Sequence, residues 1–190
     1  MVNRRIRASR TSRPPLNPIE LVDMTLFFAD EVIHGNYPYL QFDPDHRWHQ
    51  RLYRDQRVDI WLLSWLPTQG TTLHDHGVSS GAFTVVRGEL AEAVYLRRGP
   101  QSGSLDERVH AVGTSIGFDK QHVHDVRNLS DRPAVSVHAY SLPLVSMNFY
   151  DVEGGELVRT SWTCCLSKPM LVPTGCARSS RLPARGPRRR

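Results

Sequence analysis

The chain has 190 residues, of which 39% are hydrophobic and 23% are charged. This length suits one folded domain, and the composition excludes collagen, coiled coil and wholesale disorder. No run of residues approaches the roughly 18–20 uninterrupted apolar residues of a membrane helix, and the N-terminal stretch lacks the apolar core of a secretory signal. We therefore expect a cytoplasmic protein with no membrane partner.

The positive charge is concentrated at the two ends of the chain. The formal net charge is +5, but residues 1–15 carry five arginines and residues 176–190 carry six, with no acidic residue in either stretch. Without these 11 arginines, 13 of the 24 basic residues are left against 19 acidic residues, so residues 16–175 carry a net charge of −6. A folded basic face for nucleic acid is not indicated. We expect a domain over 16–162 between disordered basic ends, and no specific nucleic-acid partner; salt-sensitive binding through the arginine-rich ends is the alternative.

Residues 18–33 are predicted to form a helix. Asn17 can cap it, Pro18 suits its first turn, and Glu20 can return a hydrogen bond to the cap. Apolar residues recur at helical spacing with acidic residues opposite, which indicates a helix packed on a sheet. The predicted apolar stripe consists of Ile19, Val22, Leu26, Ala29 and Ile33, widened by Leu21, Phe28 and Val32.

From about residue 47 the pattern changes to short strands separated by turn residues. Many short strands at this spacing predict a mainly β fold, a sandwich or a small barrel. The predicted strands are 48–54, 58–66, 81–86, 90–96, 122–128, 133–142 and 146–151.

Two histidine pairs stand out in the strand region. His74 and His76 are two residues apart, as are His122 and His124. In a strand such side chains share one face about 6.6 Å apart, so both rings can reach one metal ion. Cysteine offers no ligand here, because all three cysteines lie after residue 163. The alternative for each pair is two ordinary polar strand residues, and spacing alone leaves His122 and His124 as rival third ligands.

The intervals around these pairs resemble the two metal-binding motifs of the cupin superfamily. His76 is followed by Gly81 and Gly88, and His124 is followed four positions later by Asn128. Gly81 occupies the place of a carboxylate ligand, and Asp119 and Gln121 replace a usual proline and glycine. More narrowly, the sequence resembles the bacterial type of the cysteine dioxygenase type I family over about residues 20–152. The matching stretches are 61–67, 73–83, 85–88, 123–128 and 133–141.

The resemblance implies a cupin-type jelly-roll barrel with Fe(II) held by His74, His76 and His124. It implies oxidation of a small thiol to a sulfinate by O₂, with L-cysteine as the first substrate and 3-mercaptopropionate as the alternative. A metal-binding cupin without catalysis is the rival from another class. With Gly81 in place of an acid, three neutral histidines leave the metal doubly charged, and space opens beside it. Because some relatives carry a cysteine at that position, crosslinked to the tyrosine that matches Tyr140, no crosslink is expected here.

Ser136, His138 and Tyr140 resemble the family's row of polar residues beside the metal. At alternate positions of one strand they share a face, where a hydroxyl, an imidazole and a phenol can relay hydrogen bonds. Arg51 is the candidate anchor for a substrate carboxylate, since a guanidinium can hold a carboxylate bidentately. One alternative is that Arg51 forms a surface salt bridge. The other is that its neighbour Gln50 is the anchor, because relatives that act on 3-mercaptopropionate tend to use a glutamine near this place.

Overall fold

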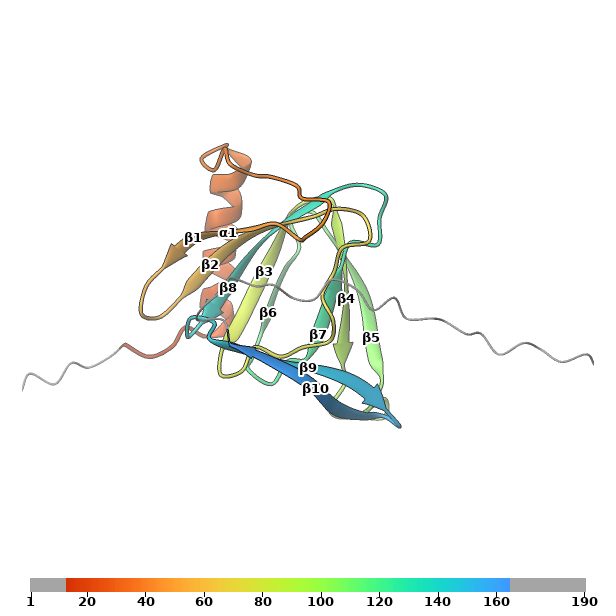
Figure 1. Ribbon diagram of the computed structural model, residues 1–190. Coiled ribbons are helices and arrows are strands. Elements are labelled where there is room, and N and C mark those ends of the chain that lie inside the picture. The colour runs from red at the N-terminus through yellow and green to blue at the C-terminus, as the bar shows by residue number, and fades with distance from the viewer. Residues whose placement is uncertain (1–12, 165–190) are drawn as a thin grey trace, which may run out of the picture.

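The computed structural model describes residues 13–164 (Figure 1). The basic ends predicted from the sequence therefore lie mostly outside the described residues. Within residues 13–164, no helix is long and apolar enough to cross a membrane. The described residues form one helix and ten strands, arranged as packed antiparallel sheets, so the fold is mainly β as expected.

The helix α1 (Pro18–Ile33) has the predicted bounds and cap. The Asn17 side chain accepts hydrogen bonds from the backbone N–H groups of Ile19 and Glu20, and the Glu20 carboxylate accepts one from the N–H of Asn17. The predicted buried face is only partly confirmed, because Leu21, Phe28 and Ala29 are buried but other members of the stripe are not. Ile19, Leu26 and Ile33 are exposed, and the side chains packed on the sheet are Leu21, Thr25, Phe28 and Ala29. Thr25 joins that face because its hydroxyl is bonded by Thr84 and donates to the carbonyl of Val22.

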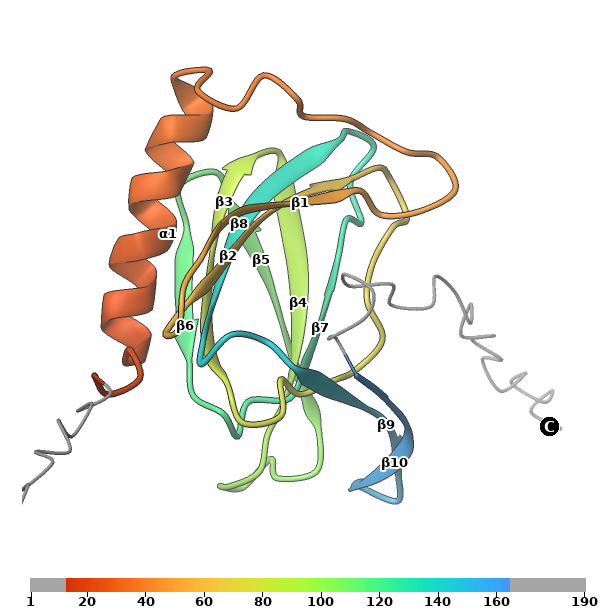
Figure 2. The same cartoon turned by 60° about the vertical axis from the view of Figure 1, so that its left-hand side comes forward.

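A five-stranded antiparallel sheet forms the layer next to α1. Its strand order is β1 (His49–Arg54), β2 (Asp59–Trp65), β8 (Ala134–Ser141), β3 (Ser80–Arg87) and β6 (Ser115–Phe118). Every residue of β2 and β8 is buried, because α1 covers one face of the sheet and the other strands cover the second (Figure 2). Strands buried on both faces read as nearly continuous apolar runs, which is the pattern of β2.

The second layer consists of two smaller sheets. One has the order β5 (Leu105–Ala111), β4 (Glu89–Tyr95) and β7 (His124–Arg127), and the other is the hairpin of β9 (Ser146–Glu153) and β10 (Glu156–Cys164). The strands thus form three sheets and do not close into the single barrel that was expected. Strands β5, β6 and β10 were not predicted from the sequence.

The space between the layers is filled by large side chains. Trp61, Leu63 and Trp65 project from alternate positions of β2 into the same core as Phe83 and Met147. The intervening residues of β2 point to α1 instead, where a second core lies. The polar residues described next line the edge of the core between the layers.

Candidate metal centre

The segment that carries His74 and His76 is extended but is not a regular strand. His74 and His124 exchange both backbone hydrogen bonds, at 2.8 and 3.0 Å, and His74 also bridges to Phe149 of β9. The segment therefore runs between β7 and β9. This pairing brings the first histidine pair beside the second, and it fixes His74 opposite His124.

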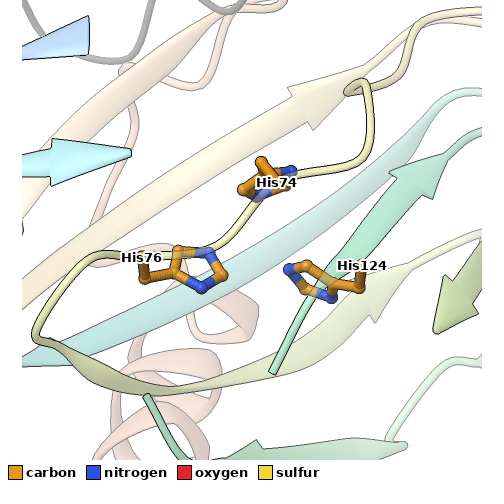
Figure 3. A group of neighbouring side chains, drawn as sticks. All are labelled: His74, His76 and His124. Carbon is orange, nitrogen blue, oxygen red and sulfur yellow. The ribbon is translucent and has the colours of Figure 1, made fainter. Parts of the chain in front are cut away.

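The rings of His74, His76 and His124 converge (Figure 3). Their centroids lie 4.9 to 5.1 Å apart, and one nitrogen from each ring lies within 4.8 Å of the others. Nδ1 of His74 lies 2.7 Å from the carbonyl oxygen of Thr72, so it carries the proton and Nε2 keeps its lone pair. Both ring nitrogens of His76 are buried without a hydrogen-bond partner. A buried polar atom without a partner is costly, so these three residues fit a bound metal ion.

All three rings are deeply buried. Burial, followed by the proximity of the other histidines, lowers the pKa of His74 and His76 well below the usual value. Burial also lowers the pKa of His124, although its contact with Glu92 opposes the shift. At neutral pH the three imidazoles are therefore uncharged, which is the form that binds metals.

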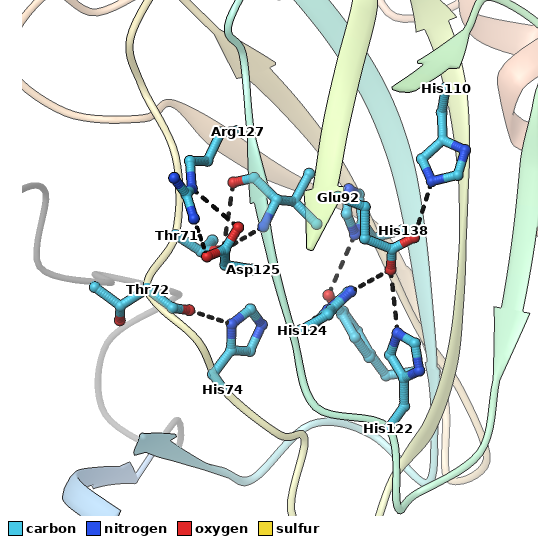
Figure 4. Close-up of polar contacts among 12 residues, drawn as sticks. Thr71, Thr72, His74, Glu92, His110, His122, His124, Asp125, Arg127 and His138 are labelled. Carbon is cyan, nitrogen blue, oxygen red and sulfur yellow. Dashed lines mark hydrogen bonds and ion pairs between the residues drawn. The ribbon is translucent and has the colours of Figure 1, made fainter. Parts of the chain in front are cut away.

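The rival ligand His122 faces another partner. Its Nε2 lies 3.1 Å from Oε1 of Glu92, which also lies 2.6 Å from Nδ1 of His124 (Figure 4). Glu92 was not predicted as a site residue. Burial would raise the pKa of its carboxyl, but the hydrogen bonds from His122 and His124 outweigh that effect and hold the pKa well below the usual range. Glu92 is therefore a buried carboxylate beside the histidine cluster.

A small cavity lies next to His74 and His124. Arg47, His138 and Tyr140 line it together with apolar side chains. Arg47 is only 7% exposed and its guanidinium lies over the Trp65 ring, 4.5 Å from the centroid. Its Nε and Nη1 have no hydrogen-bond partner, and no ion pair to it occurs within residues 13–164. Burial lowers the pKa of Arg47 to about 10, so at neutral pH it remains a cation.

The structure joins Ser136, His138 and Tyr140 in one row of hydrogen bonds. Ser136 Oγ lies 2.9 Å from Nε2 of His138, and Nδ1 of His138 lies 3.3 Å from the Tyr140 hydroxyl. Trp65 Nε1 donates to Ser136 Oγ at 2.9 Å. Burial lowers the pKa of His138 well below the usual value. The row therefore ends at the cavity in the phenol of Tyr140, with a neutral imidazole behind it.

Arg51 does not line the cavity. Its register partner is Trp61, which pairs in turn with His138, so Arg51 lies on the sheet face that carries the site. Its guanidinium lies over the Trp61 ring, and Nε is 3.1 Å from Oδ1 of Asp59. Gln50 pairs with Leu62, which belongs to the core on the helix side. Of the two neighbours, the structure thus turns Arg51 toward the site but engages it in a salt bridge.

The sequence did not identify Arg47 as a site residue. Arg47 lies before the predicted strand 48–54, so the alternation of side chains between the two faces of a strand does not predict where it points. The chain turns at Asp43, whose carboxylate accepts the N–H groups of Asp45 and His46. Gln69 holds the same turn by donating to the Asp43 carbonyl. An aspartate at this place is a turn signal, but a turn does not determine which way the Arg47 side chain points.

Gly81 does not open space beside the histidines, contrary to the expectation. A Cβ atom there would lie 2.5 Å from the ring of Phe118 and 3.1 Å from Cδ1 of Tyr140. Phe118 fills the position and stacks on His76, with centroids 5.0 Å apart. The absent acid is therefore replaced by an aromatic ring from β6.

The remaining motif residues have structural partners. Asn128 donates to the carbonyl groups of Trp65 and Arg132 and builds the turn that precedes β8. Asp75, between the two histidines, accepts hydrogen bonds from Asn148 and Tyr150 of β9. Asp75 therefore supports the segment that carries the two histidines.

The sequence is similar to known proteins over the part of the chain that holds these site residues. The sequence model of the family described as cysteine dioxygenase type I matches residues 29–153. The chain belongs to the cysteine dioxygenase type I family. Cysteine dioxygenase type 1 of Homo sapiens is 28% identical over 117 residues, which is 56% of each chain, and that of Danio rerio is 26% identical over 111 residues, 53% of each. The chain spans about half the length of these curated relatives.

Solved structures similar to this member of the cysteine dioxygenase type I family have low sequence identity. The protein TT1209 from Thermus thermophilus has a TM-score of 0.48 and 21% identity, covering 56% of this chain and 92% of its own. An RmlC-like cupin protein from Desulfovibrio desulfuricans has a TM-score of 0.46 and 15% identity, with the same coverage.

Proposed function

We propose that this protein is an iron-dependent thiol dioxygenase that oxidises L-cysteine to cysteine sulfinate with O₂. Family membership supports the reaction class. The observation that carries the proposal is the meeting of three neutral histidines, two of which, His74 and His124, line one cavity with a buried arginine whose Nε and Nη1 have no hydrogen-bond partner. Fe(II) bound by His74, His76 and His124 would supply the redox chemistry that joins O₂ to the substrate sulfur.

The other residues of the cavity bind and orient the substrate. Arg47 is a buried cation that requires an anion, and a substrate carboxylate meets that need with charge-assisted hydrogen bonds. The Tyr140 phenol lies at the cavity end of the hydrogen-bonded row, where it can hold a proton near the reacting thiol. His138 and Ser136 fix the orientation of that phenol.

Arg47 and Arg51 form a matched pair for testing the anchor. Arg47→Gln should lower kcat/KM about 10- to 100-fold, mainly through a higher KM, because a charged hydrogen bond is worth about 1.5–3 kcal/mol. Arg51→Gln should change kcat/KM by less than about threefold, because Arg51 does not line the cavity and the buried Asp59 keeps its ion pair with Arg54. Steady-state O₂ uptake measures both. A large loss in Arg51→Gln with a small one in Arg47→Gln would restore the anchor that the sequence predicts.

A second substrate is supported by the chemistry of the cavity. Among the residues that line it there is a cation but no carboxylate to pair with a substrate ammonium group. A thiol acid without an amine, such as 3-mercaptopropionate, therefore fits the same lining. It would use the same iron and the same Arg47.

The deciding experiment is O₂ consumption by the iron-loaded protein with each thiol, with the product mass recorded. We expect faster turnover of L-cysteine and a product that has gained two oxygen atoms. Faster turnover of 3-mercaptopropionate would move the proposal to the second substrate. Bound iron with no O₂ uptake from either thiol would contradict the proposal and favour a cupin that binds metal without catalysis.

A further inference from the structure

Glu92 on β4 lies at the centre of three histidine side chains (Figure 4). The residue is 3% exposed. Its Oε2 lies 2.8 Å from Nε2 of His110, while Oε1 lies 3.1 Å from Nε2 of His122 and 2.6 Å from Nδ1 of His124. A buried carboxylate is stable only when hydrogen bonds replace its water shell. The three rings supply those bonds.

The carboxylate determines which nitrogen of each ring carries a proton. An ionised glutamate can only accept hydrogen bonds, so each nitrogen facing it must be an N–H donor. For His124 this nitrogen is Nδ1, and a neutral imidazole carries only one N–H. Nε2 of His124 therefore keeps its lone pair. Figure 3 shows the second nitrogen of His124 pointing toward His74 and His76.

The distances distinguish hydrogen bonding from a second metal site. Glu92, His122 and His124 also group closely enough to hold a metal ion. Ligand atoms about 2.0–2.2 Å from a tetrahedral metal lie roughly 3.4 Å from one another. The observed N–O separations of 2.6 to 3.1 Å are those of hydrogen bonds.

We propose that Glu92 is a positioning residue for the metal site. Held from two sides by His110 and His122, it fixes the tautomer and ring orientation of His124, so that Nε2 is directed at the metal. This inference rests on the metal site of the proposed function. His110 and His122 act on the metal site through Glu92, and this role accounts for the placement of the buried His110 and the partly buried His122 beside it.

The first test is metal affinity in the full-length, metal-free protein, with Zn²⁺ as the probe and a chromophoric chelator as competitor. Glu92→Gln keeps the shape of the side chain but replaces one acceptor oxygen with an NH₂ donor that faces N–H groups. We expect Zn²⁺ affinity to fall 10- to 100-fold, the usual effect of losing a group that orients a metal ligand. Glu89→Gln is the matched control, because it makes the same change at an exposed position of the same strand.

The second test reads the tautomer directly and needs no metal. Two-bond ¹H–¹⁵N NMR of the metal-free, histidine-labelled protein should show His124 as the Nδ1–H form, and Glu92→Gln should mix the two forms. His124 found as Nε2–H in the wild type, two Zn²⁺ ions bound per chain, or unchanged affinity in Glu92→Gln would each overturn the positioning role. If Glu92→Gln does not fold, His122→Gln should lower affinity several-fold, and unchanged affinity there would overturn it too. Failure of the wild type to bind Zn²⁺ would instead count against the metal site itself.

Discussion

Trp65 gives the hydrogen-bonded row behind Tyr140 a direction. An indole N–H can only donate, so Ser136 Oγ accepts from Trp65. Among the described residues the other partner of this hydroxyl is Nε2 of His138, to which we assign the Ser136 proton. His138 then carries its proton on Nδ1 and donates it to the oxygen of Tyr140. The phenol therefore receives a hydrogen bond from behind, and its own proton is directed elsewhere.

Removing the N–H donor of Trp65 should weaken the hydrogen-bonded row behind Tyr140 but should leave the metal bound. Trp65→Phe is expected to lower kcat about tenfold, the lower end of the effect of losing a group that orients a site residue, with metal content unchanged. Trp61→Phe is the control, because it loses the same N–H from the same face of β2 but contacts neither Ser136 nor His138 through it. Equal losses in kcat for the two variants would contradict the direction assigned to the row.

Gly81 is required by packing. Because an added Cβ would meet the Phe118 ring at 2.5 Å, Gly81→Ala should destabilise the protein by about 1–3 kcal/mol, the usual cost of overpacking. The double variant Gly81→Ala with Phe118→Leu should recover part of that loss. Urea unfolding of the two single variants and the double variant measures the coupling. Simple additivity would mean that Phe118 does not restrict this position.

The sequence predicts the residues of the site that follow a spacing rule. The histidine pairs and the alternating row of β8 are local patterns, and the structure brings those residues together. Glu92 and Arg47 are brought in by tertiary contacts, from a strand and from a turn that lie far from the histidine motifs. A lone glutamate in β4 and an arginine before β1 carry no periodic signal, so only the folded arrangement identifies them.

Among the elements, strands rich in buried apolar residues, such as β2, β3 and β8, were predicted, whereas β5, β6 and β10 were not. β5 is missed because its buried side chain is the polar His110 while Val109 is exposed, which reverses the usual alternation. The helix α1 was located correctly, but its wide apolar arc includes more residues than one face can bury. Which part of the arc packs is decided by the shape of the sheet and by the hydroxyl pair of Thr25 and Thr84.

The strand β9 holds the histidine-bearing segment through Asp75. The Tyr150 hydroxyl donates to the Asp75 carboxylate at 2.6 Å, and burial together with this contact raises the pKa of Tyr150 to about 12. A raised pKa means that the folded state holds the proton more tightly than the unfolded state, whose tyrosine titrates near 10. The resulting stability is present below about pH 10 and is lost as the pH rises toward 12.

Tyr150→Phe should therefore make the alkaline loss of stability shallower. Urea unfolding at several values between pH 8 and 12 measures the free energy of unfolding of both proteins. We expect the wild type to be more stable at pH 8 by about 1 kcal/mol, the net value of a hydrogen bond, and the difference to shrink as the pH rises. A constant difference across this range would show that Tyr150 does not titrate against Asp75.

At the scale of the whole molecule, the three histidines join two segments of the chain that backbone pairing and side-chain hydrogen bonds already hold side by side. His74 and His76 come from the segment beside β9, and His124 comes from β7 of the three-stranded sheet.

A metal ion bound to all three histidines would bind only the folded state, and free metal at 100 times its dissociation constant would then add about 2.7 kcal/mol of stability. For a protein of this size that corresponds to a rise in Tm of roughly 5–10 °C. Chelation should reverse the rise, as followed by circular dichroism. His76→Ala should show little of it, because it removes a ligand whose ring nitrogens have no other partner. A full shift in His76→Ala would place the metal elsewhere.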